Sequence, residues 1–363
     1  MLPYLAEHFG DLFGPLRLFT STLFLAGLGT ALCTVGTWIA LPSLWHVLPT
    51  DQGRAHAVGA DGSIGKPVGA GLIFVLIFAA SAALILPLRW PYLVVLFCML
   101  MSMAVGYLDD RSEGGWHEYH LGLFDLVVAV IAATAVCRLG QSPVWLPFVK
   151  SSILVPPSLF IAGGSVLIWV TINATNCTDG VDGLSGSLSA MALVFLGGIL
   201  YGIVGHQEIS AYLLVPHYPD GAQWGTLAFL MAGCLAGYLW YNCDPSQVLM
   251  GDAGSRPVGL LLGVMVLACG NPFLIVVVAG VVLVNGATGL IKVALLRVQR
   301  SHFLNKLTLL HSIRVPLFTD VRYPLHDHVR FNLGWSNARV LVRFVLIQAI
   351  GTVLLLILLL KVR

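Results

Sequence analysis

Aspartates gather in four polar segments that interrupt the long apolar runs of this chain. These are the pair Asp109-Asp110, the segment with Asp179 and Asp182, the segment with Asp244 and Asp252, and the triplet His326-Asp327-His328. Each segment stands at the end of an apolar run, and the pattern puts all four ends on one side of a membrane. Hard cations such as Mg²⁺ bind carboxylate oxygens and keep coordination positions open for phosphate. The sequence therefore predicts a divalent-metal site for phosphate chemistry.

The segment Asn173–Leu184 carries two Asn, two Thr, two Asp and two Gly within twelve residues. Glycine allows the backbone to approach a ligand closely. Asp179 and Asp182 are three residues apart, so a helical turn would place both on one face. The loop after this segment contains no Lys or Arg, which predicts carboxylates without a local countercharge.

The segment Met250–Ser255 reads Met-Gly-Asp-Ala-Gly-Ser and precedes an apolar run. A Gly-Asp-x-Gly-Ser turn at a helix start could offer unpaired N–H groups to a phosphate while its Asp holds a metal. The simpler interpretation is an ordinary turn with Ser255 as a helix cap.

Composition defines the elements that must position these residues. The chain has 363 residues, of which 58% are apolar and 10% charged, and its mean hydropathy is +0.89. These values exclude a cytosolic globular enzyme, a nucleic-acid binder and a disordered chain. The pattern instead predicts an all-α polytopic membrane protein of one domain, residues 1–363. A span needs about 20 apolar residues, and ten runs qualify: 18–41, 69–88, 91–108, 123–139, 152–174, 186–205, 223–242, 256–270, 273–296 and 340–360.

Basic residues predict the orientation of these spans. The loops after odd-numbered spans carry about twice as many Lys and Arg as the other side, mostly in the connection before the last span. The positive-inside rule then makes the aspartate-bearing loops cytoplasmic and both termini external. Within that connection, residues 298–323 have apolar residues at helical spacing, which indicates an inserted amphipathic helix on the membrane surface or a helix packed against its neighbours.

These motifs together resemble the polyprenyl-phosphate N-acetylhexosamine-1-phosphate transferases. The acidic motifs specify that superfamily. The N-terminal and C-terminal matching pieces resemble its peptidoglycan branch, the phospho-N-acetylmuramoyl-pentapeptide transferases: Met1-Leu2, Leu5–His8, Lys66–Gly71, Pro324–His328, Gly334-Trp335-Ser336, Val342–Phe344 and Leu360–Arg363.

The resemblance implies ten helices around a cytoplasmic catalytic cleft in the bacterial inner membrane, usually as homodimers. Such enzymes transfer phospho-MurNAc-pentapeptide from its UDP carrier to undecaprenyl phosphate and require Mg²⁺. It further implies that Asp252 and Asp179 hold Mg²⁺, and that Asp109 and Asp110 handle the lipid phosphate. The lipid phosphate would attack directly, or an Asp would form a phospho-enzyme. The remaining implied substrate-binding residues are Lys66, Asn173, Asn176, Asp182, Leu249, Gly251, His326, Asp327 and His328.

The chain departs from the family pattern at several of these positions. The family usually shows three consecutive His, and Asp327 replaces the middle one. Asp327 could keep a flanking His protonated, bind metal itself, or point to water. The loop after Asp110 has one Arg where the family is Lys-rich, and Leu249 stands where a Phe commonly stacks on uracil.

Two other functions are compatible with parts of the sequence. A sister transferase using UDP-GlcNAc often shares the Asp-Ala-Gly-Ser form, although Gly334-Trp335-Ser336 and the terminal Lys-Val-Arg favour the peptidoglycan branch. A transporter would carry acids near the membrane midplane, whereas the acids above stand at span ends.

Overall fold

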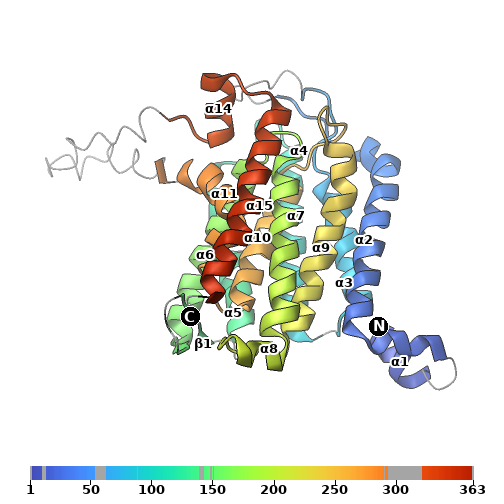
Figure 1. Cartoon of the computed structure of the whole chain (residues 1–363). Helices are drawn as coiled ribbons and strands as arrows, with labels where there is room; N and C mark the ends of the chain where they lie inside the picture. The colour runs from blue at the N-terminus through green and yellow to red at the C-terminus, as the bar shows by residue number, and fades with distance from the viewer. Residues whose placement is uncertain are drawn as a thin grey trace, which may run out of the picture.

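The computed structural model describes residues 2–9, 14–53, 63–87, 89–138, 143–147, 149, 151–289, 291–292 and 321–361. Within these residues, ten apolar helices form one bundle (Figure 1). They are α2 (Thr22–Leu44), α3 (Gly71–Ile85), α4 (Trp90–Arg111), α5 (Glu118–Cys137), α6 (Pro157–Thr178), α7 (Leu184–Ile199), α9 (Gly221–Asn242), α10 (Asp252–Ala268), α11 (Leu274–Val282) and α15 (Asn337–Lys361).

Each of these helices overlaps one of the ten predicted runs, so the predicted all-α polytopic membrane fold is confirmed. Among the described residues, seven of these helices are long and apolar enough to cross a membrane by themselves, and α3, α10 and α11 are shorter. A π-helical segment, η4 (Leu200–Val204), continues α7, and another, η5 (Leu283–Ala287), continues α11.

The remaining elements are short and lie before the first span or between spans. A two-residue antiparallel pair, with Pro143 opposite Leu154, was not predicted. The short elements are α1 (Leu2–Phe9), η1 (Gly14–Thr20), η2 (Trp45–Val47), β1 (Pro143–Val144), β2 (Ile153–Leu154), α8 (Gln207–Tyr212) and α14 (Leu325–Leu333). Most of the predicted amphipathic segment 298–323 lies outside the described residues.

Local signals explain where several helices begin. Pro91 and Pro157 occupy the first turns of α4 and α6, where proline costs no hydrogen bond. His117 caps α5, and Glu118 adds an acid to its first turn.

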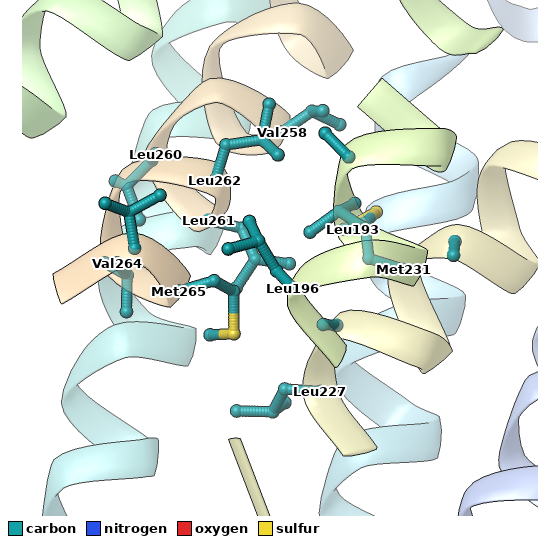
Figure 2. Packing of buried hydrophobic residues seen from close by; sticks show 14 of the residues in the cluster. Leu193, Leu196, Leu227, Met231, Val258, Leu260, Leu261, Leu262, Val264 and Met265 are labelled. Atoms are coloured by element: carbon teal, nitrogen blue, oxygen red, sulfur yellow. The ribbon is translucent and has the colours of Figure 1, made fainter. Parts of the chain in front are cut away.

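Helix α10 lies at the centre of the bundle. All of its 17 residues are buried, because α3, α4, α5, α6, α7 and α9 surround it. Figure 2 shows Leu261 and Met265 of α10 close to Leu193 and Leu196 of α7 and Leu227 of α9. A helix enclosed on every side needs no polar face, which explains why its sequence is apolar after the first turn.

The two ends of the bundle differ in what they carry. Both chain termini lie at one end, and α14 lies at the other (Figure 1). The C-terminal ends of α4, α6 and α9 and the start of α10 meet at the end that holds α14, as the contacts below establish.

Candidate active site

Asp252 is the first residue of α10, and polar side chains from α6 and α10 hold its buried carboxylate. Asn176 Nδ2 donates to Asp252 Oδ1 at 2.8 Å and to Ser255 Oγ at 3.1 Å. Arg256 Nε donates to Asp252 Oδ2 at 2.8 Å. Preceding it, Gly251 adopts φ 68° and ψ 179°, a conformation that is essentially restricted to glycine. The predicted residues Asn176, Gly251 and Asp252 are therefore brought together.

The start of α10 is closed to an incoming phosphate by Asp110. Its Oδ1 accepts the N–H of Asp252 at 2.9 Å, and its Oδ2 accepts the N–H of Ala253 at 3.0 Å. The N–H groups of Gly254 and Ser255 donate to the Gly251 carbonyl. The prediction that this helix start offers unpaired N–H groups to a phosphate is therefore wrong. Asp110 acts as a side-chain cap from α4, and its predicted role toward the lipid phosphate stays a prediction.

Two glycines let α3 and α4 press directly on the first turn of α10. A Cβ at Gly71 would lie 2.0 Å from the backbone nitrogen of Gly254, and a Cβ at Gly106 would lie 2.4 Å from the carbonyl of Asp252. Contacts this short leave no room for any side chain. The backbone that carries Asp252 is thus fixed by neighbours on two sides.

Asp109, half-buried beside Asp110, also lies near the Asp252 carboxylate. Its Oδ1 accepts the N–H of Trp116 at 2.5 Å, which orients the carboxylate from the α4–α5 loop. Its negative charge lies close enough to that of Asp252 for the two to repel.

This pair of carboxylates suits a Mg²⁺ ion shared with a substrate. In the described part of the chain, no three His, Cys, Asp or Glu side chains surround one point as in an all-protein metal site. Mg²⁺ at phosphate-transfer sites is usually held by one or two carboxylates, water and the substrate phosphates. Asp109 and Asp252 match that donor set.

The loop between α6 and α7 is a turn, not helix. Residues 179–183 separate the two helices, so the prediction that Asp179 and Asp182 share a helical face is wrong. Asp179 directly follows α6, and its N–H donates to the Asn176 carbonyl at 3.1 Å.

Asp182 faces the α9–α10 loop and a cation from another loop. Its Oδ2 accepts the N–H of Ser246 at 3.0 Å and lies 4.0 Å from Lys66 Nζ. Lys66 also donates to Ser246 Oγ at 3.0 Å. The local absence of Lys and Arg was thus misleading, because Lys66 supplies a countercharge from the segment before α3. Asn242 joins the same loops by accepting the Gly183 N–H and donating to the Val248 carbonyl.

Leu249 lies beside the segment that carries Lys66. Its N–H donates to the Pro67 carbonyl at 2.8 Å, and its carbonyl accepts the N–H of Ala70. This pairing brings the segment that carries Lys66 alongside Leu249, two residues before Gly251.

The side chains of His326 and His328 point to different partners. His326 is 2% exposed, its N–H donates to Asn285 Oδ1 at 2.8 Å, and Asn285 in turn donates to Thr178 at the end of α6. A Cβ at Gly180 would lie 2.4 Å from the His326 ring nitrogen Nε2. The His326 ring therefore packs on the turn after Asp179, whereas His328 Nδ1 accepts the N–H of Arg322 at 3.2 Å.

Asp327 pairs with a neighbour on its own helix. Its Oδ1 lies 3.5 Å from Arg330 and 3.8 Å from His326 Nε2, and its side chain is 14% exposed. The alternative in which Asp327 simply points to water is wrong. Burial raises the pKa of Asp327, against the lowering effect of Arg330 and Arg322. Burial, aided by Arg330, lowers the pKa of His326 to about 4, so the idea that Asp327 keeps this His protonated at neutral pH is wrong.

The lowered pKa of His326 predicts acid sensitivity. The native state binds the proton less well than the unfolded state, so stability is lost as pH falls from about 6.5 towards about 4. The full shift corresponds to about 3 kcal/mol. Thermal unfolding in detergent at pH 7 and pH 5 should show a larger drop for the parent than for His326→Gln. Equal drops would show that His326 does not titrate in this way.

Sequence reasoning missed two charged residues next to the site. Asp125 lies within the predicted run 123–139 and is 1% exposed, and Arg256 is 6% exposed. They form an ion pair at 2.6 Å, and Asn173 Nδ2 lies 3.5 Å from the same Asp125 oxygen. An isolated acid inside an apolar span is the signal that could have found Asp125, because such residues are costly unless they serve a purpose.

Comparison of the sequence with known proteins identifies the family of this chain. A family model, glycosyl transferase family 4, matches residues 92–270. A phospho-N-acetylmuramoyl-pentapeptide-transferase from Treponema pallidum is 45% identical over 354 residues, which cover 97% of this chain and 94% of that protein. The chain belongs to the phospho-N-acetylmuramoyl-pentapeptide-transferase family.

More distant relatives carry the same name. The protein from Opitutus terrae is 30% identical, with 95% of each chain covered, and that from Helicobacter hepaticus is 27% identical, with 85% of each covered. The family model ends at residue 270 and spans α4 to α10, the helices that position Asp109, Asp110, Asn176 and Asp252. The resemblance predicted from the motifs is thus confirmed, and the chain is a membrane-embedded phosphoglycosyl transferase.

Proposed function

We propose that this transferase moves phospho-MurNAc-pentapeptide from UDP to undecaprenyl phosphate, giving lipid I and UMP in the first membrane step of peptidoglycan synthesis. The observation that carries the proposal is the 45% identity over nearly the whole chain to a relative named for this pentapeptide transfer. The gathering of Asp109, Asn176, Asp252 and His326 at one end of the bundle supports it.

The site residues suggest a division of labour in this reaction. Mg²⁺, held by Asp252 with Asp109 or Asp179, would neutralise the diphosphate that is attacked. Lys66, beside Asp182, would add a positive charge for the nucleotide-sugar. Asn176 and Asp110 keep Asp252 and the start of α10 in place. His326, neutral at physiological pH, would offer a hydrogen bond without adding charge. The rest of the reaction is largely positioning of two anions in line.

A comparison of nucleotide-sugar donors tests the proposal. Membranes containing the protein, supplied with undecaprenyl phosphate and Mg²⁺, should release UMP from UDP-MurNAc-pentapeptide. They should release far less from UDP-GlcNAc. The reverse preference would assign the chain to the sister branch, and UMP release from neither donor would overturn the proposed function.

We also propose that the site faces the cytoplasm of the bacterial inner membrane and that both termini are external. The basic loops support this orientation, and the structure separates the termini from α14 (Figure 1). The homodimer implied by the resemblance stays a prediction, which the mass of the detergent-solubilised protein would test.

Cysteine labelling is expected to establish the orientation. In a Cys243→Ser background, which removes the exposed native cysteine, Gln207→Cys should react with an impermeant thiol reagent in intact cells. Glu113→Cys, in the loop beside Asp109, should react only after the cells are opened. Both residues are exposed, so access is not blocked by packing. The opposite labelling would place the site outside.

A further inference from the structure

Arg256 is a buried cation placed between two carboxylates. It lies one turn after Asp252 in α10 and is 6% exposed. Its NH1 is 2.6 Å from Asp125 Oδ2, and its NH2 is 2.7 Å from Asp252 Oδ2. Its Nε donates to that same Asp252 oxygen at 2.8 Å. Two arms of the guanidinium thus hold Asp252, and the third reaches α5.

Asp125 has the features of an anchor for this arginine. It is 1% exposed in the interior of α5, and its Oδ2 accepts the hydrogen bond from Arg256. Within the described residues, its Oδ1 is buried and has no hydrogen-bond partner. A carboxylate buried in a membrane helix is costly unless it is paired. Its ion pair with Arg256 is the contact that accounts for its presence.

The charges around Asp252 explain why its direction needs control. Asp109 and Asp110 lie close enough to Asp252 for negative charge on either carboxylate to repel that of Asp252. Mutual repulsion would turn the Asp252 carboxylate away from its neighbours. A guanidinium that makes two contacts with a carboxylate fixes the direction of that carboxylate as well as balancing its charge. The ion pair with Asp125 of α5 keeps the guanidinium from moving together with the Asp252 carboxylate.

We infer that Arg256, anchored by Asp125, is a positioning residue that fixes the direction of the Asp252 carboxylate towards the metal. This inference rests on the proposed function, in which Asp252 holds Mg²⁺. Groups that orient a metal ligand typically change metal affinity by about 10- to 100-fold when they are removed.

A double variant, Arg256→Leu with Asp125→Leu, separates positioning from stability. Replacing both members of a buried ion pair with apolar residues is often neutral or stabilising, and Asn176 still donates to the Asp252 carboxylate. The double variant should therefore fold, with a thermal midpoint below that of the parent because Asp252 loses its countercharge. Without the guanidinium, binding of Mn²⁺ to the detergent-solubilised protein, measured by electron paramagnetic resonance, should weaken by about tenfold or more. The Mg²⁺ concentration for half-maximal UMP release should rise in parallel.

The expected sign of the change makes this test strict. In the double variant, the lost positive charge of Arg256 contacts Asp252 directly, whereas the lost negative charge of Asp125 lies behind it, so charge alone would not weaken metal binding. Unchanged or tighter Mn²⁺ binding in the folded double variant would therefore overturn the inference. If the unsubstituted protein binds Mn²⁺ but releases no UMP, the proposed function is wrong. The difference in Mn²⁺ affinity between this protein and the double variant would still test the role of Arg256.

Two further variants complete the design. If the double variant does not fold, Asp125→Asn carries the test, because its amide oxygen can still accept from Arg256 while the anchoring charge is lost. Mn²⁺ binding should weaken in Asp125→Asn, and binding equal to the parent would overturn the inference. The control is Asp220→Asn, which removes a 2.8 Å ion pair with exposed Arg89 at the start of α4. Mn²⁺ binding should be unchanged in this control.

Discussion

Replacement of Asp252 by Asn is expected to reduce turnover by about a hundredfold or more while the protein still folds. Asn keeps the size of the side chain, and its oxygen can still accept a hydrogen bond from Asn176 or Arg256. The variant loses the negative charge that the proposed mechanism uses to hold Mg²⁺. A hundredfold loss corresponds to about 2.7 kcal/mol of transition-state stabilisation. The measurement is kcat for UMP release at saturating donor and Mg²⁺.

Folding of this variant must be checked separately. Its thermal midpoint in detergent should stay within a few degrees of the parent, since Arg256 keeps its pairing with Asp125. Retention of more than about a tenth of the parental kcat would be a loss below about 1.4 kcal/mol. That value is too small for a principal metal ligand and would remove Asp252 from this role.

Gly71→Ala is expected to cause the second large loss, through the backbone instead of through charge. Its new methyl group would lie 2.0 Å from the backbone nitrogen of Gly254, so α3 and α10 would have to move apart. Overpacking of this kind typically costs 1–3 kcal/mol of stability. A displacement of about 1 Å at a catalytic group can lower kcat by about a hundredfold. Both the thermal midpoint and kcat should fall.

Gly198→Ala is the matched control. Gly198 is also a helical glycine of a membrane span, but a Cβ there would meet nothing within 4 Å. Alanine favours helix more than glycine does, so stability should be kept or slightly raised and kcat unchanged. Equal behaviour of the two variants would show that the close contact at Gly71 does not position the site.

The apolar runs were enough to predict the spans, and the acidic motifs that follow or precede these runs were enough to predict the polar residues at the span ends. The ten helices followed from run length, because in a bilayer every spanning backbone must form helix or closed barrel. The sequence could not predict which distant segments meet. Lys66 lies near Asp182, and His326 contacts Asn285, only because different helices pack together. The central place of α10 depends on which helices surround it, and a run of apolar residues is compatible with burial in lipid as well as in protein.

The acidic motifs were identified by type, but their division into roles needed the structure. Asp109 and Asp110 are adjacent in sequence and both lie near Asp252, yet Asp110 caps the start of α10 whereas Asp109 accepts from the α4–α5 loop. The pair of Arg256 and Asp125 was missed because the two residues fall in different predicted runs, 256–270 and 123–139, and nothing in the sequence pairs those runs. A hydrogen-bonded network between α5, α6 and α10 gives both residues a shared position next to Asp252.

Formation of the lipid-linked product tests the central claim most directly. Purified protein would be mixed with UDP-MurNAc-pentapeptide and undecaprenyl phosphate, and the lipid fraction analysed by mass spectrometry. With Mg²⁺ present, undecaprenyl-diphospho-MurNAc-pentapeptide should appear in equal amount to UMP, and it should be absent after chelation or in the Asp252→Asn variant. Product formed equally well without a divalent cation, or by that variant, would contradict a metal-dependent transfer centred on Asp252.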